Sequence, residues 1–127
     1  MTFPAADFLE FARRLSNAPN VPGPDEAALR TAASRAYYAA FHEALARACR
    51  EGYQATYSGV DHERVRAHYR ESAPPSPARR RVSTQLGRLI DLRKMADYEP
   101  LLDRTASSLA SHAISMANII ITDLQGL

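Results

Sequence analysis

The 127-residue sequence has one cysteine, no tryptophan and only five glycines. A lone cysteine, Cys49, cannot form an internal disulfide, so we expect a protein of a reducing compartment, the cytoplasm. The apolar run at residues 119–121 is far shorter than the roughly 20 residues that a membrane span needs. The first residues also lack the basic start and apolar stretch of a signal peptide. We therefore expect neither a secreted protein nor a membrane partner.

Sequence motifs of several enzyme classes are missing as well. The chain has no glycine-rich phosphate loop, no HExxH, no paired cysteines and no serine-centred elbow. These absences argue against nucleotide hydrolysis, zinc proteolysis and serine-hydrolase chemistry. His62 and His68 are six residues apart, which is not a zinc-binding spacing on a helix. We expect both imidazoles on a solvated face, and we expect neither a metal nor another cofactor.

The composition is that of one globular domain over residues 1–127, with 46% apolar and 24% charged residues. The formal net charge is +2, but residues 61–94 hold nine basic and four acidic side chains. Fifteen of the sixteen basic residues are arginines, whose planar fork binds phosphate through two parallel hydrogen bonds. This usage fits a nucleic-acid partner. It fits the codon bias of a GC-rich genome equally well, and both interpretations stay open.

Apolar residues recur with a helical period through the whole chain. There is no alternating strand pattern, hairpin turn or internal repeat, so we predict an all-α fold, an up-and-down bundle of four to five helices. Gly52 stands where a left-handed cap would end the second helix, and Pro100 follows the end of the fourth. The predicted helices comprise residues 4–16, 26–51, 61–71, 78–98 and 105–124, with a linker at 17–24 and a loop at 72–77.

Each predicted helix has a face that we expect to be buried. Tyr37 and Phe41 are expected in the core of the second helix. His112 falls on the apolar stripe of the last helix, where we expect a core histidine. The other expected inward residues are Phe8, Phe11, Leu15, Val65, Tyr69, Val82, Leu86, Leu89, Ile90, Leu109, Ala113, Met116, Ile120 and Leu124.

The second predicted helix carries the most informative polar residues. Steps of three and four residues place Arg35, Tyr38 and His42 on one stripe, because seven residues turn an α-helix through almost two revolutions. Arg35 and His42 then lie about 10 Å apart along the axis, a gap that an arginine side chain or a substrate phosphate can bridge. A guanidinium inside a bundle costs several kcal/mol unless it is paired. This stripe therefore needs either a structural partner or a ligand.

Arginine and histidine together suffice for RNA cleavage without a metal. The imidazole transfers a proton near neutral pH, and the guanidinium stabilises the charge of the phosphate in the transition state. In the alternative interpretation, carboxylates of other helices satisfy both Arg35 and His42. Tyr38 could orient either residue or stack on a base; alternatively, its ring packs and its hydroxyl binds a neighbouring helix.

Two segments resemble motifs of the HEPN domain family (higher eukaryotes and prokaryotes nucleotide-binding). The first runs from Ser34 to His42 (SRAYYAAFH) and the second from Leu92 to Tyr98 (LRKMADY). The resemblance covers nearly the whole chain and is to small stand-alone prokaryotic members. It implies a helical bundle, a homodimer and, in many members, a metal-independent endoribonuclease. The active motif of these members is an Arg followed after a short gap by a His, which Arg35 and His42 match, and two copies form one composite site.

The resemblance also implies roles and partners. Arg35 would grip the scissile phosphate of RNA, His42 would act as general acid or base, and Tyr38 would support both. The protein would be the toxin of a toxin–antitoxin or antiphage module, with a nucleotidyltransferase-like protein as its antitoxin. The alternative, which the same family contains, is a non-catalytic interaction or nucleotide-binding module.

Other charged residues support these expectations less directly. Arg93 and Asp97 are four residues apart, so we predict an ion pair on one helix face and structural support at the end of that helix. Asp97 and Tyr98 are alternatively expected to orient His42. A solvated surface would explain the remaining arginines as well as RNA contact does. Those predicted to contact an RNA backbone are Arg64, Arg66, Arg70, Arg79, Arg80 and Arg81.

Overall fold

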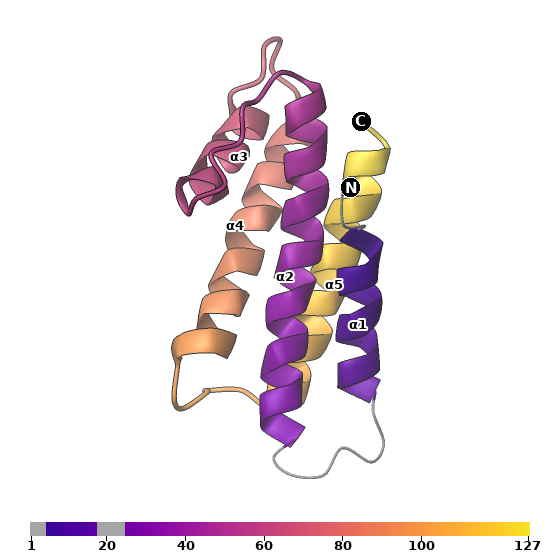
Figure 1. Ribbon diagram of the computed structural model, residues 1–127, viewed down its shortest axis with the longest axis vertical. Helices are drawn as coiled ribbons and strands as arrows, with labels where there is room; N and C mark the ends of the chain where they lie inside the picture. Colours follow the sequence, from indigo (N-terminus) through magenta and orange to yellow (C-terminus); the bar gives the residue numbers. More distant parts are fainter. Residues whose placement is uncertain (1–4, 18–24) are drawn as a thin grey trace.

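The computed structural model describes residues 5–17 and 25–127, which form five helices and no strand (Figure 1). The all-α prediction is confirmed for this part of the chain. None of the described helices combines the length and the apolar character needed to cross a membrane. The predicted start of the first helix at residue 4 and the linker residues 18–24 lie outside the described residues. The helices are α1 (Ala5–Asn17), α2 (Asp25–Arg50), α3 (Val60–Arg70), α4 (Pro77–Tyr98) and α5 (Ala106–Gln125).

The helix α2 is central and packs against each of the other four described helices. The helices α1, α2, α4 and α5 run lengthwise in the up-and-down manner predicted from the sequence, whereas the shorter α3 lies beside one end of α4 (Figure 1). Because α2 contacts every neighbour, the residues at the edge of its buried face meet side chains from several helices.

Alanines allow α2 to occupy this central position. Their small side chains let neighbouring helices approach closely, because the distance between packed helices depends on the side chains at the contact. Tyr37 and Phe41 are buried beside them, which confirms their predicted place in the core. The fully buried alanines of α2 are Ala32, Ala33, Ala36, Ala39, Ala40, Ala44 and Ala48.

Two arginines of α2 fix the ends of its neighbours. The Arg30 guanidinium donates to the carbonyl oxygen of Ala96, at 3.2 Å, in the last turn of α4. Arg47 donates to the carbonyl oxygens of Leu124 and Leu127, at 3.2 and 2.7 Å, at the end of α5. The last carbonyls of a helix have no donor within the helix, and a positive charge is favourable there. The α2 helix therefore holds both helix ends in place.

The described helix ends coincide with the predicted ones or differ by a single residue. Gly52 has a φ angle of +104°, the left-handed conformation predicted for the end of α2. The Ser76 hydroxyl accepts a hydrogen bond from the backbone N–H of Arg79, at 3.2 Å, where α4 begins. The Thr105 hydroxyl accepts one from the N–H of Ser108, at 3.0 Å, where α5 begins. Both are capping bonds typical of serine and threonine before a helix.

Most of the predicted inward residues are buried or half-buried, but two are not. Phe11 is 50% exposed, because α1 buries Leu9 and Ala12 instead. His112 is exposed, so the predicted core histidine is wrong. The buried line of α5 passes through Ala113, and one residue turns a helix by about 100°, which directs His112 toward solvent. The confirmed buried residues are Val65, Tyr69, Val82, Leu86, Leu89, Leu109, Ala113, Ile120 and Leu124, with Phe8, Leu15, Ile90 and Met116 half-buried.

Candidate functional site

A stripe on α2 forms the middle of the candidate site. Arg35, Tyr38 and His42 are all half-buried, beside the fully buried face of the helix. The guanidinium carbon of Arg35 lies 5.8 Å from the centre of the Tyr38 ring, and the ring centre of His42 lies 6.2 Å from that same ring. The predicted shared face is therefore confirmed, and Tyr38 contacts both of its neighbours through its ring.

Arg35 and His42 have no acidic partner within the described residues. The His42 ring stacks on Phe8 of α1, with ring centres 5.2 Å apart and an angle of 12° between the planes. Burial lowers the pKa of His42 below its ordinary value, so the imidazole is neutral near pH 7. The interpretation in which carboxylates satisfy both residues does not hold for the part of the chain that the structure describes.

The end of α4 adds Arg93 to this cluster. Its guanidinium carbon lies 5.4 Å from the Tyr38 ring centre, and its Nε donates to Asp97 at 3.1 Å, which confirms the predicted ion pair. Asp97 also accepts a hydrogen bond from Ser34 of α2, at 3.2 Å, so the ion pair ties α4 to α2. Tyr98 is 70% exposed and meets the Arg93 guanidinium at 5.8 Å. Within the described residues, Asp97 and Tyr98 make these contacts rather than one with the imidazole of the stripe.

The helix α3 contributes a residue that we did not expect at the site. His62 is half-buried, and its Nδ1 shares a short hydrogen bond with the hydroxyl of Tyr37. Its ring centre lies 4.4 Å from that of Phe41 and 6.4 Å from that of Tyr38. The expected solvated face is therefore wrong for His62. A signal was present in the sequence, since His62 precedes the buried Val65 by three residues, the spacing of one helix face.

Asp61 fixes the start of α3 and thereby the position of His62. Its buried carboxylate accepts hydrogen bonds from the Tyr53 hydroxyl, at 2.6 Å, and from the backbone N–H of Thr56, at 3.0 Å. Burial alone would raise the pKa of Asp61, but its hydrogen bonds lower it to about 2. Burial, followed by the charge of Arg93, lowers the pKa of His62, so this imidazole is also neutral near pH 7.

His62 also lines a pocket between α3 and α4 with a volume of about 350 Å³. Arg66 crosses from α3 to α4 near this pocket, where its guanidinium lies over Gly87 and its Nε donates to the Ser83 carbonyl at 3.3 Å. A β-carbon at Gly87 would lie 2.5 Å from a nitrogen of that guanidinium, so the glycine permits this close approach. The pocket is lined by Gly59, His62, Glu63, Arg66, Ile90, Asp91, Arg93 and Lys94.

The arginines predicted to contact RNA lie in different surroundings. Arg64 and Arg80 are exposed and have no ion pair within the described residues. Arg70 and Arg81 are exposed but pair with acidic neighbours, at 3.3 and 3.6 Å. The other two are half-buried and engaged by groups of the protein itself. Contact of these arginines with RNA stays a prediction, and the Glu51 carboxylate bound to Arg79 argues against it at that one residue.

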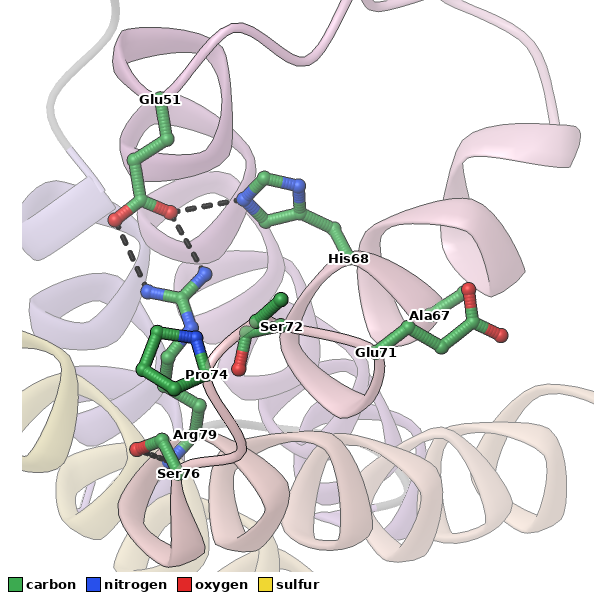
Figure 2. A pocket seen from close by; sticks show the side chains of 9 residues that line it. Glu51, Ala67, His68, Glu71, Ser72, Pro74, Ser76 and Arg79 are labelled. Carbon is green, nitrogen blue, oxygen red and sulfur yellow. Dashed lines mark hydrogen bonds and ion pairs between the residues drawn. The ribbon is translucent and has the colours of Figure 1, made fainter.

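A second polar cluster lies where α2 ends, around Glu51 (Figure 2). Arg79 donates to both carboxylate oxygens of Glu51, at 2.8 and 3.0 Å, and Nε2 of His68 lies 2.8 Å from one of them. The guanidinium carbon of Arg79 also lies 4.8 Å from the ring centre of Tyr69. His68 is therefore not on the solvated face that we expected. These groups border a pocket of about 760 Å³. The Glu51 carboxylate, however, already pairs with Arg79 and His68.

The Arg79 hydrogen bonds are the main reason why the pKa of Glu51 is lowered, to about 2; burial opposes the shift and His68 adds to it. Glu51 is therefore a carboxylate at neutral pH, and it neutralises the guanidinium that faces it. A neutralised arginine is a poor ligand for phosphate, because the phosphate would have to displace the carboxylate. We conclude that the Glu51 cluster is structural, and that the candidate site is the cluster around Tyr38.

Comparisons with known proteins give no family for the chain, since no family model, no curated protein and no solved structure matches it. The described residues also contain no group of three or more His, Cys, Asp or Glu side chains that could hold a metal ion. The main structural evidence on function is therefore the chemistry of the Tyr38 cluster. That cluster brings together Arg35 and His42 of α2, which have no acidic partner within the described residues, a second imidazole from α3 and an arginine from α4.

Proposed function

We propose that the protein is a metal-independent endoribonuclease of the HEPN type. One observation supports this proposal above all others: Arg35 and His42 are half-buried on one stripe, both in contact with Tyr38, and neither has an acidic partner within the described residues. A guanidinium that no carboxylate neutralises is available for the phosphate of a substrate. A neutral imidazole beside it can accept a proton.

The reaction that fits these groups is transphosphorylation of RNA. The 2′-oxygen attacks the adjacent phosphorus while the bond from phosphorus to the 5′-oxygen breaks. Arg35 would hold the phosphate and stabilise the charge that develops on its oxygens, and His42 would transfer a proton as general acid or base. The proton transfer is worth about 10²–10⁴-fold in rate and the charge stabilisation about 10²–10³-fold. Tyr38 would keep both side chains in place, because its ring contacts both of them.

The resemblance to HEPN proteins extends this proposal to the assembly. The active form would be a homodimer in which two copies of the stripe form one cleft for single-stranded RNA. In the cell the protein would act as the toxin of a toxin–antitoxin or antiphage module, held inactive by a nucleotidyltransferase-like antitoxin. We place the enzyme in the cytoplasm, in agreement with its single cysteine.

Replacing His42 by alanine tests the proposal. The variant should fold as the wild type does and should lose cleavage of a single-stranded RNA in the presence of EDTA by about 10²–10⁴-fold. His112→Ala is the matched control, because His112 is an exposed histidine on α5, outside the site, and this variant should cleave at the wild-type rate. Undiminished cleavage by His42→Ala would overturn the assignment.

A second function, as a nucleotide-binding module, is favoured by the pocket that His62 shares with Arg66 and Lys94. Its volume of about 350 Å³ lies in the range of pockets that hold small ligands. The same assay separates the two functions. A wild-type protein that binds a mononucleotide, as measured by calorimetry, but leaves every RNA intact would favour the binding module.

A further inference from the structure

We propose that His62 is a second proton-transfer group of the same site, so that one chain carries both the acid and the base of the reaction. This inference rests on the proposed ribonuclease function and adds to it a residue outside both motifs of the resemblance. It also changes the mechanism, because a second subunit would then be needed to shape the cleft rather than to supply the second histidine.

The positions of the two imidazoles carry the inference. The ring centres of His42 and His62 lie 6.2 and 6.4 Å from that of Tyr38. The same two ring centres lie 5.7 Å (His42) and 4.4 Å (His62) from the ring centre of Phe41. The distance between the two imidazole centres therefore cannot exceed the sum of these two distances to Phe41. A phosphodiester with one hydrogen bond of about 3 Å at its attacking oxygen and another at its leaving oxygen spans a comparable length.

Tyr37 holds the His62 ring in a fixed orientation. Its hydroxyl forms a hydrogen bond with Nδ1 of His62. Burial raises the pKa of Tyr37, so the phenol stays protonated. A hydroxyl can donate to Nδ1 or accept from it. The hydrogen bond therefore persists in both protonation states of the imidazole, while Nε2 remains the nitrogen that exchanges a proton with a substrate.

The His62 side chain is accessible as well as fixed. It is half-buried and lines the pocket of about 350 Å³ between α3 and α4. Arg93 contacts the ring of Tyr38 and lines that same pocket. Arg93 and His62 therefore border both the pocket and the Tyr38 cluster, and in the proposed complex the nucleotide next to a phosphate at Arg35 would extend toward His62.

The proton balance requires that the pair begins with one proton. One imidazole takes the proton of the 2′-hydroxyl as the 2′-oxygen bonds to phosphorus. The other, starting as imidazolium, gives its proton to the 5′-oxygen as the bond to phosphorus breaks. The products are a 2′,3′-cyclic phosphate and a 5′-hydroxyl, and the proton has moved from one histidine to the other. Water exchange resets the pair, and no oxidant, metal or other co-reactant is consumed.

This sharing of one proton gives a pH profile with two limbs. Both imidazoles have a lowered pKa, and protonating one disfavours protonating the other, so the apparent values belong to the pair. The rate should fall on both sides of an optimum that lies below the ordinary histidine pKa of about 6.5. The charged and titratable groups around His62 are Asp61, Glu63 and Arg66 of α3, Asp91, Arg93 and Lys94 of α4, and Tyr37, Tyr38 and His42 of α2.

His62→Asn is the variant that tests the inference. The asparagine amide can occupy the place of Nδ1 and keep a hydrogen bond to Tyr37, but it cannot transfer the proton. His62→Gln, which places its amide nearer to Nε2, guards against a folding defect in the first variant. We expect a loss of about 10²–10⁴-fold in cleavage for both, together with the loss of one limb of the pH profile. His112→Asn is the matched control and should keep both the rate and the two limbs.

A substrate with sulfur in place of the 5′-oxygen then identifies the role of His62. A thiolate leaves without being protonated, because the pKa of a thiol is about 8.5. Cleavage of this RNA by His62→Asn at the wild-type rate would make His62 the general acid, and a persistent loss would make it the general base. If the wild type and His62→Asn cleave ordinary RNA with the same rate and the same two limbs, the inference is overturned while the proposed function stands. If the wild type cleaves no RNA, both fail.

Discussion

The Tyr38 cluster and the Glu51 cluster both place an arginine and a histidine beside a tyrosine ring, but the surroundings of these side chains differ. In the Tyr38 cluster the Arg35 guanidinium and the His42 ring lie 5.8 and 6.2 Å from the tyrosine ring centre. In the Glu51 cluster the corresponding distances to the Tyr69 ring centre are 4.8 Å for the Arg79 guanidinium and 5.3 Å for the His68 ring. The two pairs differ in their acidic partner: Arg79 and His68 share a carboxylate, whereas Arg35 and His42 have none within the described residues.

That carboxylate is Glu51, which binds both Arg79 and His68. With it, an arginine and a histidine join the end of α2 to α3 and α4. In the Tyr38 cluster, the half-buried Arg35 and His42 have no such carboxylate within the described residues. Ionisable side chains that cluster without a neutralising partner are candidates for a functional site, so the comparison contrasts a paired trio with the trio for which we propose catalysis.

The largest expected effect in the comparison of the two clusters is a loss of folding stability when Arg79 is removed. Arg79→Ala should lower the free energy of unfolding by about 1–3 kcal/mol, because it leaves a partly buried Glu51 carboxylate without its two charged hydrogen bonds. Cleavage at a temperature where the variant is folded should be unchanged. Arg80→Ala removes the exposed neighbouring arginine and should cost less than about 0.5 kcal/mol. Denaturant unfolding of both variants checks this, and equal losses would contradict a structural role that is particular to Arg79.

A second way to test the comparison is to give Arg35 the carboxylate that it lacks. Thr31 is exposed and lies one turn before Arg35 on α2, so Thr31→Glu places an acid at the favourable spacing of four residues. We expect cleavage to fall on the order of tenfold, because the new charge pairs with Arg35 and repels the phosphate. Thr31→Gln controls for size. Stability should not fall in either variant, and an unaffected rate in Thr31→Glu would count against the role of Arg35.

The smallest expected effect is the contribution of Glu51 to acid stability. The pKa of Glu51 is about 2 in the folded protein against an ordinary 4.5, so its contribution is fully present above the ordinary value and is lost as the pH falls toward 2. Glu51→Gln removes this contribution at neutral pH, and its stability should change less between pH 5 and pH 2.5 than that of the wild type. Asp61, whose pKa is also lowered to about 2, is intact in both proteins and supplies the remaining slope. Parallel pH curves would contradict the assignment.

Much of the fold was predictable, because helix periodicity, proline, glycine and capping residues act locally. Gly52 ends α2 through its backbone conformation, and Thr105 caps the start of α5 through a hydrogen bond to a nearby residue. Both signals are local in sequence and do not depend on contacts between helices. The shared face of Arg35 and His42 follows from helix geometry alone in the same way.

The remaining features depend on how the helices meet. His62 enters the site because Asp61 fixes the start of α3 and the Tyr37 hydroxyl reaches it from α2. The pairing of Arg79 with Glu51 joins residues 28 positions apart. Such long-range pairs are set by packing, so no local pattern distinguishes the engaged Arg79 from the exposed Arg80.

The most direct test of the account compares the cleavage rates of Arg35→Ala and Arg79→Ala, measured on single-stranded RNA in EDTA at a temperature where both variants are folded. The account predicts that Arg35→Ala loses about 10²–10³-fold with an unchanged unfolding midpoint, while Arg79→Ala keeps the wild-type rate. Equal cleavage rates in the two variants, or cleavage by Arg35→Ala at the wild-type rate, would contradict the claim that Arg35 serves catalysis and Arg79 serves the fold.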